Sequence, residues 1–283
     1  MGLVSEIPYG IFQIQIGLKM RETKLCNNLL YSGEAWSSIS ERDMKRLEQV
    51  DLSLIRSLTG SHSKTVKEFM YLELGLLKPR HMMYHYHILT REDNETIKKV
   101  YLSQKEGSLK GDWVQTLKKD FEFLKESQND EDIIKMGKSE YSRQIKCKHE
   151  KAAFSLYLNH IRVHKKKMKN IAYEKLKLQT YMNHPKFGQK EIQLMCLLRS
   201  KTHPAKANFR KMNKNNINCS FHCNTLETQE HIFEECQPIH TQMKAPITIQ
   251  LSKIFGTLSD QVYIIDALME IEVIRKAMQN KSR

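Results

Sequence analysis

Four side chains that commonly bind metal ions lie close together near the carboxyl end of this sequence and restrict its local fold. Cys219, Cys223, His231 and Cys236 follow the spacing C-x3-C-x7-H-x4-C. Two thiolates across a tight turn, followed by an imidazole and a third thiolate, can meet at the corners of a tetrahedron. Zinc prefers sulfur and nitrogen ligands in this geometry, and four protein ligands leave no open position for a reactive water. The spacing therefore predicts a structural Zn²⁺ site.

The same segment leaves two alternatives open. His222 and His240 are competing nitrogen donors for the third position, and a reduced, metal-free thiol cluster would use the same residues. The other three cysteines, Cys26, Cys147 and Cys196, lie in apolar or basic helical contexts, where we expect buried thiols. Six cysteines in 283 residues are too few for a disulfide scaffold. We therefore expect a reducing, intracellular location, nuclear and/or cytoplasmic.

Apolar residues elsewhere in the chain recur every three or four positions, which is the period of an α-helix. No run of alternating residues is long enough to indicate a sheet. Ser40 with Asp43 forms a capping-box pair, and Gly60 and Gly75 are stop signals. The fold class predicted is mainly α, with two helical lobes and a small CCHC zinc-binding loop. Helices are expected at 41–58, 66–74, 79–89, 112–124, about 140–182, 192–198 and from Ser259 onward.

The polar, acidic stretch 126–132 is the best candidate for a linker. It predicts a helical lobe over 1–128, a basic helical lobe over 129–240 that ends in the zinc-binding module, and a carboxy-terminal helical segment over 241–283. No stretch of about 18 uninterrupted apolar residues is present, so no membrane partner is expected.

Positive charge is concentrated in one segment. Residues 141–214 contain 19 Lys or Arg and three acidic residues, a net charge of +16, whereas the whole chain carries +14. Such a concentration attracts polyanions, so RNA and/or DNA is the expected partner. Interleaved aromatic residues suit either base stacking or a core. The basic residues predicted to contact nucleic acid are Arg162, Lys165, Lys166, Lys167, Lys169, Arg199, Lys206, Arg210 and Lys211.

Catalytic signatures fail on inspection. His149-Glu150 begins like a zinc-protease helix, but Ala153 occupies the position of the second histidine. The segment 60–65 ends like a phosphate-binding loop but lacks the glycine before Lys64. No G-x-S-x-G nucleophile motif occurs. We therefore expect no enzymatic activity.

Several longer motifs resemble non-LTR (LINE-type) retrotransposon reverse transcriptase polyproteins. LLYSGEAW at Leu29–Trp36 and HSKTVKEFMYLELG at His62–Gly75 look like the stretch that follows the polymerase palm. KGDW at Lys110–Trp113 and ETQEHIFEEC at Glu227–Cys236 are similar to later parts of the same proteins, and the cysteine spacing matches their carboxy-terminal cysteine-rich segment.

The resemblance implies the thumb-like and cysteine-rich portion that follows the palm, with zinc as cofactor. Reverse transcriptases hold two Mg²⁺ ions on palm aspartates, typically including an adjacent Asp-Asp pair, and this sequence contains no such pair. The resemblance, together with the missing pair, therefore implies a non-catalytic nucleic-acid-binding remnant within a retrotransposon ribonucleoprotein. The alternatives are a truncated part of an active RNA-directed DNA polymerase and a non-functional transposon fossil or helical interaction protein.

Overall fold

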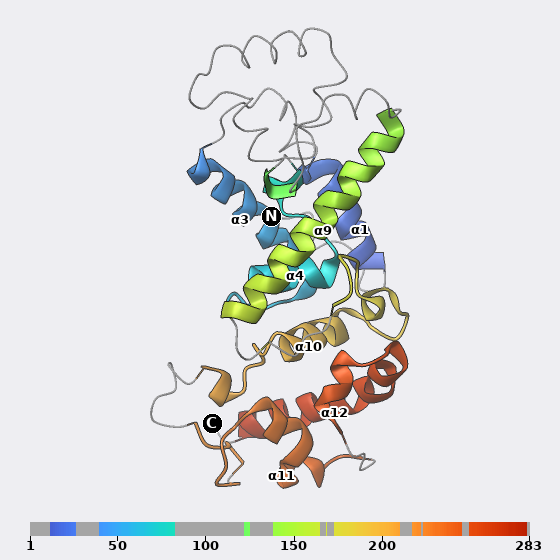
Figure 1. The fold of residues 1–283 in the computed structure, drawn as a ribbon. Helices are drawn as coiled ribbons and strands as arrows, with labels where there is room; N and C mark the ends of the chain where they lie inside the picture. The colour runs from blue at the N-terminus through green and yellow to red at the C-terminus, as the bar shows by residue number, and fades with distance from the viewer. Residues whose placement is uncertain are drawn as a thin grey trace.

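The computed structural model describes residues 12–26, 40–82, 122–124, 138–164, 168, 173–209, 217–221, 223–244 and 249–281. Within these ranges the protein is mainly helical, as predicted, and contains no strand (Figure 1). Isolated antiparallel bridges join Leu74 to Leu178 and Asn218 to Leu226. None of the described helices combines the length and the apolar character needed to cross a membrane.

The helices form two groups along the length of the molecule (Figure 1). The first group contains α1, α3, α4 and α9, with α9 packed on α4. The second contains α11 and α12, and α10 lies between the groups. The α-helices are α1 (Phe12–Met20), α3 (Glu41–Thr59), α4 (Lys67–Leu74), α9 (Lys138–His164), α10 (Gln189–Arg199), α11 (Gln237–His240) and α12 (Leu258–Lys281). Shorter helical turns are η1 (Arg21–Cys26), η4 (Thr180–Asn183), η5 (Lys206–Phe209), η6 (His231–Glu235) and η7 (Leu251–Phe255).

The ends of α3 and α4 follow from their sequence signals. The Ser40 hydroxyl accepts a hydrogen bond from the Asp43 backbone N–H at 3.1 Å, which satisfies a free donor at the start of α3. Gly60 and Gly75 end α3 and α4 in the left-handed conformation, with φ of 60° and 65°. Both helices are therefore confirmed, together with their predicted stop signals.

The later helices are also close to prediction. α10 covers the predicted 192–198 with a few residues added at its amino end. α12 begins at Leu258, one residue before the predicted start, because Thr257 caps it. The Thr257 hydroxyl accepts from the Asp260 backbone N–H at 3.2 Å, and the Asp260 carboxylate accepts from the Thr257 N–H at 3.0 Å.

The helix predicted over about 140–182 is too long. α9 ends at His164. The chain near Leu178 instead pairs with the end of α4, where the Gln179 backbone N–H donates to the Glu73 carbonyl at 3.0 Å. Because this long-range pairing needs extended backbone, tertiary contacts override the local helical pattern. Most of the helices predicted at 79–89 and 112–124 lies outside the described residues.

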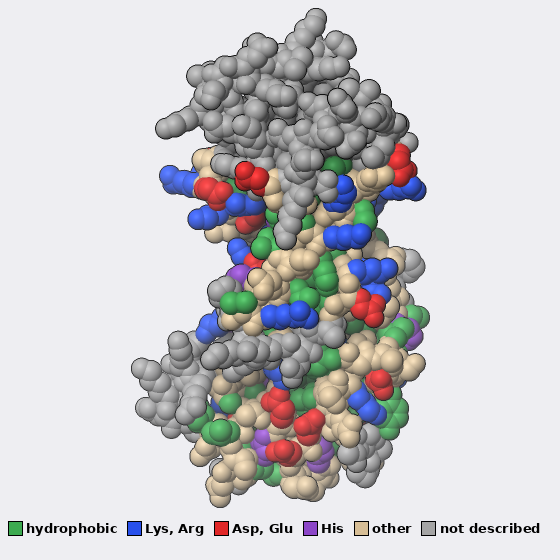
Figure 2. All heavy atoms as spheres, in the orientation of Figure 1, with side chains coloured by type: hydrophobic (Ala, Val, Ile, Leu, Met, Phe, Trp, Pro, Cys, Tyr) green, Lys and Arg blue, Asp and Glu red, His purple; other side chains and the backbone are tan. Residues whose placement is uncertain are grey.

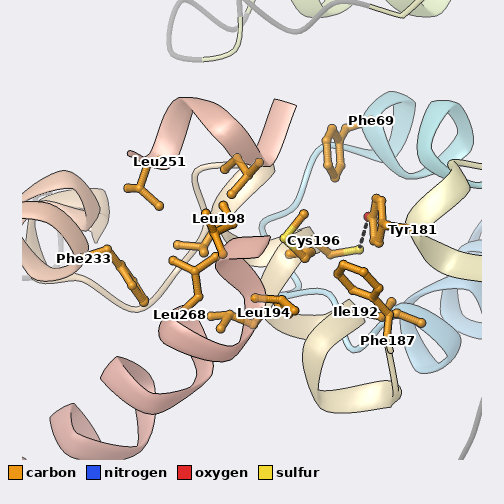
Figure 3. Packing of buried hydrophobic residues seen from close by; sticks show 14 of the residues in the cluster. Phe69, Tyr181, Phe187, Ile192, Leu194, Cys196, Leu198, Phe233, Leu251 and Leu268 are labelled. Carbon is orange, nitrogen blue, oxygen red and sulfur yellow. Dashed lines mark hydrogen bonds between the residues drawn. The ribbon is translucent and has the colours of Figure 1, made fainter. Parts of the chain in front are cut away.

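One continuous hydrophobic cluster joins the described elements. It includes Phe69 of α4, Tyr181 of η4, Leu198 of α10, Phe233 of η6 and Leu268 of α12, and Figure 3 shows their packing. The cluster therefore contains residues from all three predicted domain segments. The domain boundaries at 128/129 and 240/241 stay predictions.

Candidate metal centre and basic surface

A short hairpin carries the first two cysteines of the cluster. The Cys219 backbone N–H donates to the Thr225 carbonyl at 2.7 Å, and the Glu227 N–H donates to the Ile217 carbonyl at 2.9 Å. The turn is completed by Asn224, whose φ of 56° is left-handed, a conformation that asparagine adopts more readily than most residues. The Phe221 N–H points at the Cys219 sulfur at 3.4 Å. The hairpin therefore holds Cys219 and Cys223 on one side of a tight turn.

Two short helical turns supply the other two side chains. His231 begins η6, and Cys236 lies where η6 ends and α11 begins. The Cys236 backbone N–H donates to the His231 carbonyl at 2.7 Å, while the Cys236 carbonyl accepts from the Ile239 N–H at 3.0 Å. This sharp change between turns directs both side chains toward the hairpin.

The four predicted ligands converge. Their ligand atoms all lie within 4.8 Å of one another, with Cys219, His231 and Cys236 buried and Cys223 half-buried. The Cys236 sulfur is 3.8 Å from that of Cys219 and 3.6 Å from that of Cys223. Two sulfurs at 2.3 Å from a tetrahedral zinc would be about 3.8 Å apart. The cluster could therefore hold a metal ion.

The structure also separates the competing histidines. The His231 ring lies beside the Thr225 hydroxyl, and its Nδ1 is 3.7 Å from the Glu235 carboxylate, the kind of partner that orients a metal-binding imidazole. His240 is not part of the converging group. Burial lowers the pKa of His240. His222 lies outside the described residues.

Burial changes the acidity of the cluster thiols. It raises the pKa of Cys223, and at Cys236 burial and then the adjacent Cys219 sulfur raise the pKa well above the usual range of a thiol. Closely packed thiolates repel one another, and a divalent cation between them would offset that repulsion.

The segment that carries the cluster is acidic. Residues 217–240, here called the metal module, contain four Glu and no Lys, Arg or Asp. Glu227 is buried and accepts hydrogen bonds from the backbone N–H groups of Lys206 at 3.2 Å and Ser220 at 2.9 Å, so it fastens the hairpin to η5. Acidic and histidine side chains gather at the end of the molecule where α11 lies (Figure 2).

The basic residues predicted to contact nucleic acid differ in exposure and in their partners. Arg162 is exposed on α9. Lys206 is half-buried, and its ammonium donates to the Asn218 carbonyl at 3.0 Å. The prediction for Arg199 is wrong, because its side chain is only 3% exposed and pairs with Glu73 at 2.8 Å, out of reach of a phosphate. The other predicted residues lie outside the described ranges: Lys165, Lys166, Lys167, Lys169, Arg210 and Lys211.

Several other side chains of the basic segment belong to the core. Tyr157, Tyr173, Tyr181 and Phe187 are buried, so the core alternative holds for them and base stacking does not. Cys196 is a buried thiol as expected, and burial raises its pKa to about 12. Cys147 is exposed on α9, which corrects the expectation that it is buried.

A basic hollow on α9 was missed by the sequence reasoning. It has a volume of about 600 Å³ and runs along one face of the helix, next to residues 123 and 124. The signal was present as Lys148, Lys151, Ser155 and Asn159, spaced three or four residues apart. We call this hollow the α9 groove; its lining residues are Phe123, Leu124, Lys148, Lys151, Ala152, Ser155, Leu156 and Asn159.

Comparison with protein-family models, with curated proteins and with solved structures finds no match for this chain. The resemblance to LINE-type proteins therefore rests on the sequence motifs alone.

Proposed function

We propose that this chain is a non-catalytic nucleic-acid-binding protein, stabilised by a structural zinc ion and derived from the part of a LINE-type reverse transcriptase that follows the palm. The observation that carries this proposal is the division of charge. The 19 basic and three acidic residues of 141–214 directly precede the metal module. A phosphate backbone is the partner that such a segment attracts most strongly.

Zinc is the proposed metal because of the donor set. Three thiolates and one imidazole are sulfur and nitrogen ligands that suit zinc, whereas magnesium and calcium prefer oxygen ligands. With four protein ligands, the ion has no open position for a substrate or a reactive water. Its proposed role is therefore to hold the hairpin, η6 and α11 together.

The proposed role in nucleic-acid binding predicts little sequence preference. Contacts to phosphates position a protein on nucleic acid but do not read its bases. We expect the chain to bind unrelated RNA and DNA sequences with similar affinity. It would do so either alone or as part of a retrotransposon ribonucleoprotein.

The test is a titration of the full chain with fluorescently labelled oligonucleotides of unrelated sequence. The affinity should fall by at least about tenfold between 50 and 200 mM salt, because each neutralised phosphate releases a counterion. Affinity that stays constant over this range would contradict nucleic-acid binding. In the same sample, elemental analysis should find one equivalent of zinc, and a metal-free chain would contradict the metal site.

A further inference from the structure

The metal module has a negative charge, which disfavours the binding of nucleic acid to its surface. Its four glutamates are not balanced by any Lys or Arg within 217–240. Three zinc-bound thiolates would carry more negative charge than one Zn²⁺ ion neutralises. A phosphate backbone is repelled by such a surface. If the chain binds nucleic acid, the contact should lie on another surface.

The outer face of α9 has the opposite character. Its inner face, with Ile145, Ala153 and Tyr157, is buried in the core. From Lys151 to the end of the helix at His164 no acidic residue occurs. Lysine and arginine side chains lie over α9 on the face of the molecule seen in Figure 2. Within this part of α9 the charged side chains are therefore those of Lys151 and Arg162, while the Glu68 carboxylate of α4, next to His160, is buried.

The polar side chains on this face are placed for backbone contacts. Lys151, Ser155, Asn159 and Arg162 are all exposed. They follow one another at three- or four-residue intervals, which puts them along one side of the helix. At a rise of 1.5 Å per residue, Lys151 and Arg162 are about 16 Å apart. A stacked strand with a phosphate every 3.4 Å or so would meet several of these donors.

The shape of the α9 groove favours a single strand. At about 600 Å³ it is of the size that encloses small ligands. Leu156, 47% exposed, offers an apolar surface for a base beside the cationic edge. Single-strand binders combine a basic groove with aromatic side chains on which bases stack, and here Leu156 offers apolar contact to a base instead.

We propose that one strand of RNA or DNA lies in the α9 groove and continues along α9 to Arg162. Lys151 and Arg162 contact its phosphates, and Ser155 and Asn159 donate hydrogen bonds to phosphate or sugar oxygens. The inference rests on the proposed function, since it locates the surface at which that binding occurs.

The test compares two variants of the full chain that lose the same charge. Lys151→Gln removes a groove cation, and Lys190→Gln removes an exposed lysine of α10 from the same basic segment. Binding of an oligothymidylate of about 12 nucleotides is followed by fluorescence anisotropy over a range of salt concentrations. Lys151→Gln should lower the slope of log affinity against log salt by about 0.7, the value for one phosphate contact to a single strand. Lys190→Gln should leave the slope unchanged.

The outcomes separate this inference from the proposed function. If the slope changes equally in both variants, or in neither, while salt-dependent binding persists, the α9 groove is not the binding surface. Absence of salt-dependent binding in the unmodified chain would remove the proposed function first. Equal dependence on Lys151 for a hairpin duplex would overturn the preference for a single strand. Binding of polyglutamate that requires Lys151, together with strand binding that does not require it, would assign the groove to an acidic protein instead.

A second measurement does not depend on substitution. Ultraviolet crosslinking of a bromodeoxyuridine oligonucleotide, followed by mass spectrometry, should label the peptide 148–163. Crosslinks confined to the metal module would overturn the inference.

Discussion

The Glu73 carboxylate lies in the interior with three side-chain partners. It accepts hydrogen bonds from Tyr173 at 2.5 Å, Tyr181 at 2.9 Å and Arg199 at 2.8 Å. Burial opposes the charge of Arg199, but Glu73, Tyr173 and Tyr181 together outweigh burial and raise the pKa of the guanidinium. Arg199 also donates to the Ile254 carbonyl, so one charge pair ties α4, α10 and η7 together. Such a pair is costly to break, because the remaining partner stays buried.

Replacing Glu73 by alanine should therefore lower the free energy of unfolding by about 3 to 5 kcal/mol, measured by urea denaturation. Asp266→Asn is the matched control. This change breaks the ion pair between Asp266 and Lys186. The Asp266 side chain is 76% exposed. That change should cost no more than about 1 kcal/mol. Equal losses in the two variants would show that burial of the Glu73 pair does not determine its contribution.

The ends of α3 and α4 use glycine in the same backbone conformation but in different surroundings. A Cβ on Gly60 would lie 2.7 Å from the side chain of Gln193, which is exposed and can move. A Cβ on Gly75 would lie 2.2 Å from the backbone carbonyl carbon of Lys177. The second position is therefore closed by the segment that pairs with α4, and the glycine there has a tertiary as well as a local role.

Gly60→Ala should cost about 1 to 2 kcal/mol of stability, the penalty of the left-handed conformation. Gly75→Ala should cost a further 1 to 3 kcal/mol or so, because the backbone of Lys177 must move. Thermal unfolding of both variants, followed by circular dichroism, measures the difference. Equal stability of the two would contradict the close approach of the chain at Lys177.

At the scale of the whole molecule, the metal module is part of the main core. Ile232, Phe233 and Ile239 are completely buried in the cluster that also contains Leu268 and Ile271 of α12. Both η6 and α11 contact α12. A change in the module should therefore be transmitted to the carboxy-terminal helix, since interior packing leaves little space for independent movement.

Removing zinc should lower the melting temperature of the chain as a whole. At free zinc 100 times above its dissociation constant, the ion contributes about 2.7 kcal/mol, or roughly 5 °C for a chain of this size. Calorimetry with and without a chelator measures the shift, and Cys219→Ser should reproduce it. Cys147→Ser, which changes an exposed thiol outside the cluster, is the control. Loss of bound zinc with no change in melting temperature would contradict a stabilising role.

The local signals of this chain were readable without the structure. The cap at Ser40 and the stops at Gly60 and Gly75 depend on hydrogen bonds and backbone conformations within a few residues, so the sequence predicts them. The same is true of the convergence of the four cysteine and histidine side chains, because a metal site restricts the spacing of its ligands. The mainly α fold follows from helical periodicity.

Only the tertiary structure decided which charges are on the surface. The sequence does not distinguish Arg199 from Arg162. Arg199, however, forms a buried ion pair with Glu73, more than 100 positions away. The bridge from Leu74 to Leu178 places the chain near Leu178 in an extended conformation where the local pattern predicted helix. Composition determined that a basic segment exists beside the ligand cluster. Packing between distant residues decided that α9 presents an exposed basic groove, because burial depends on partners that sequence spacing does not contain.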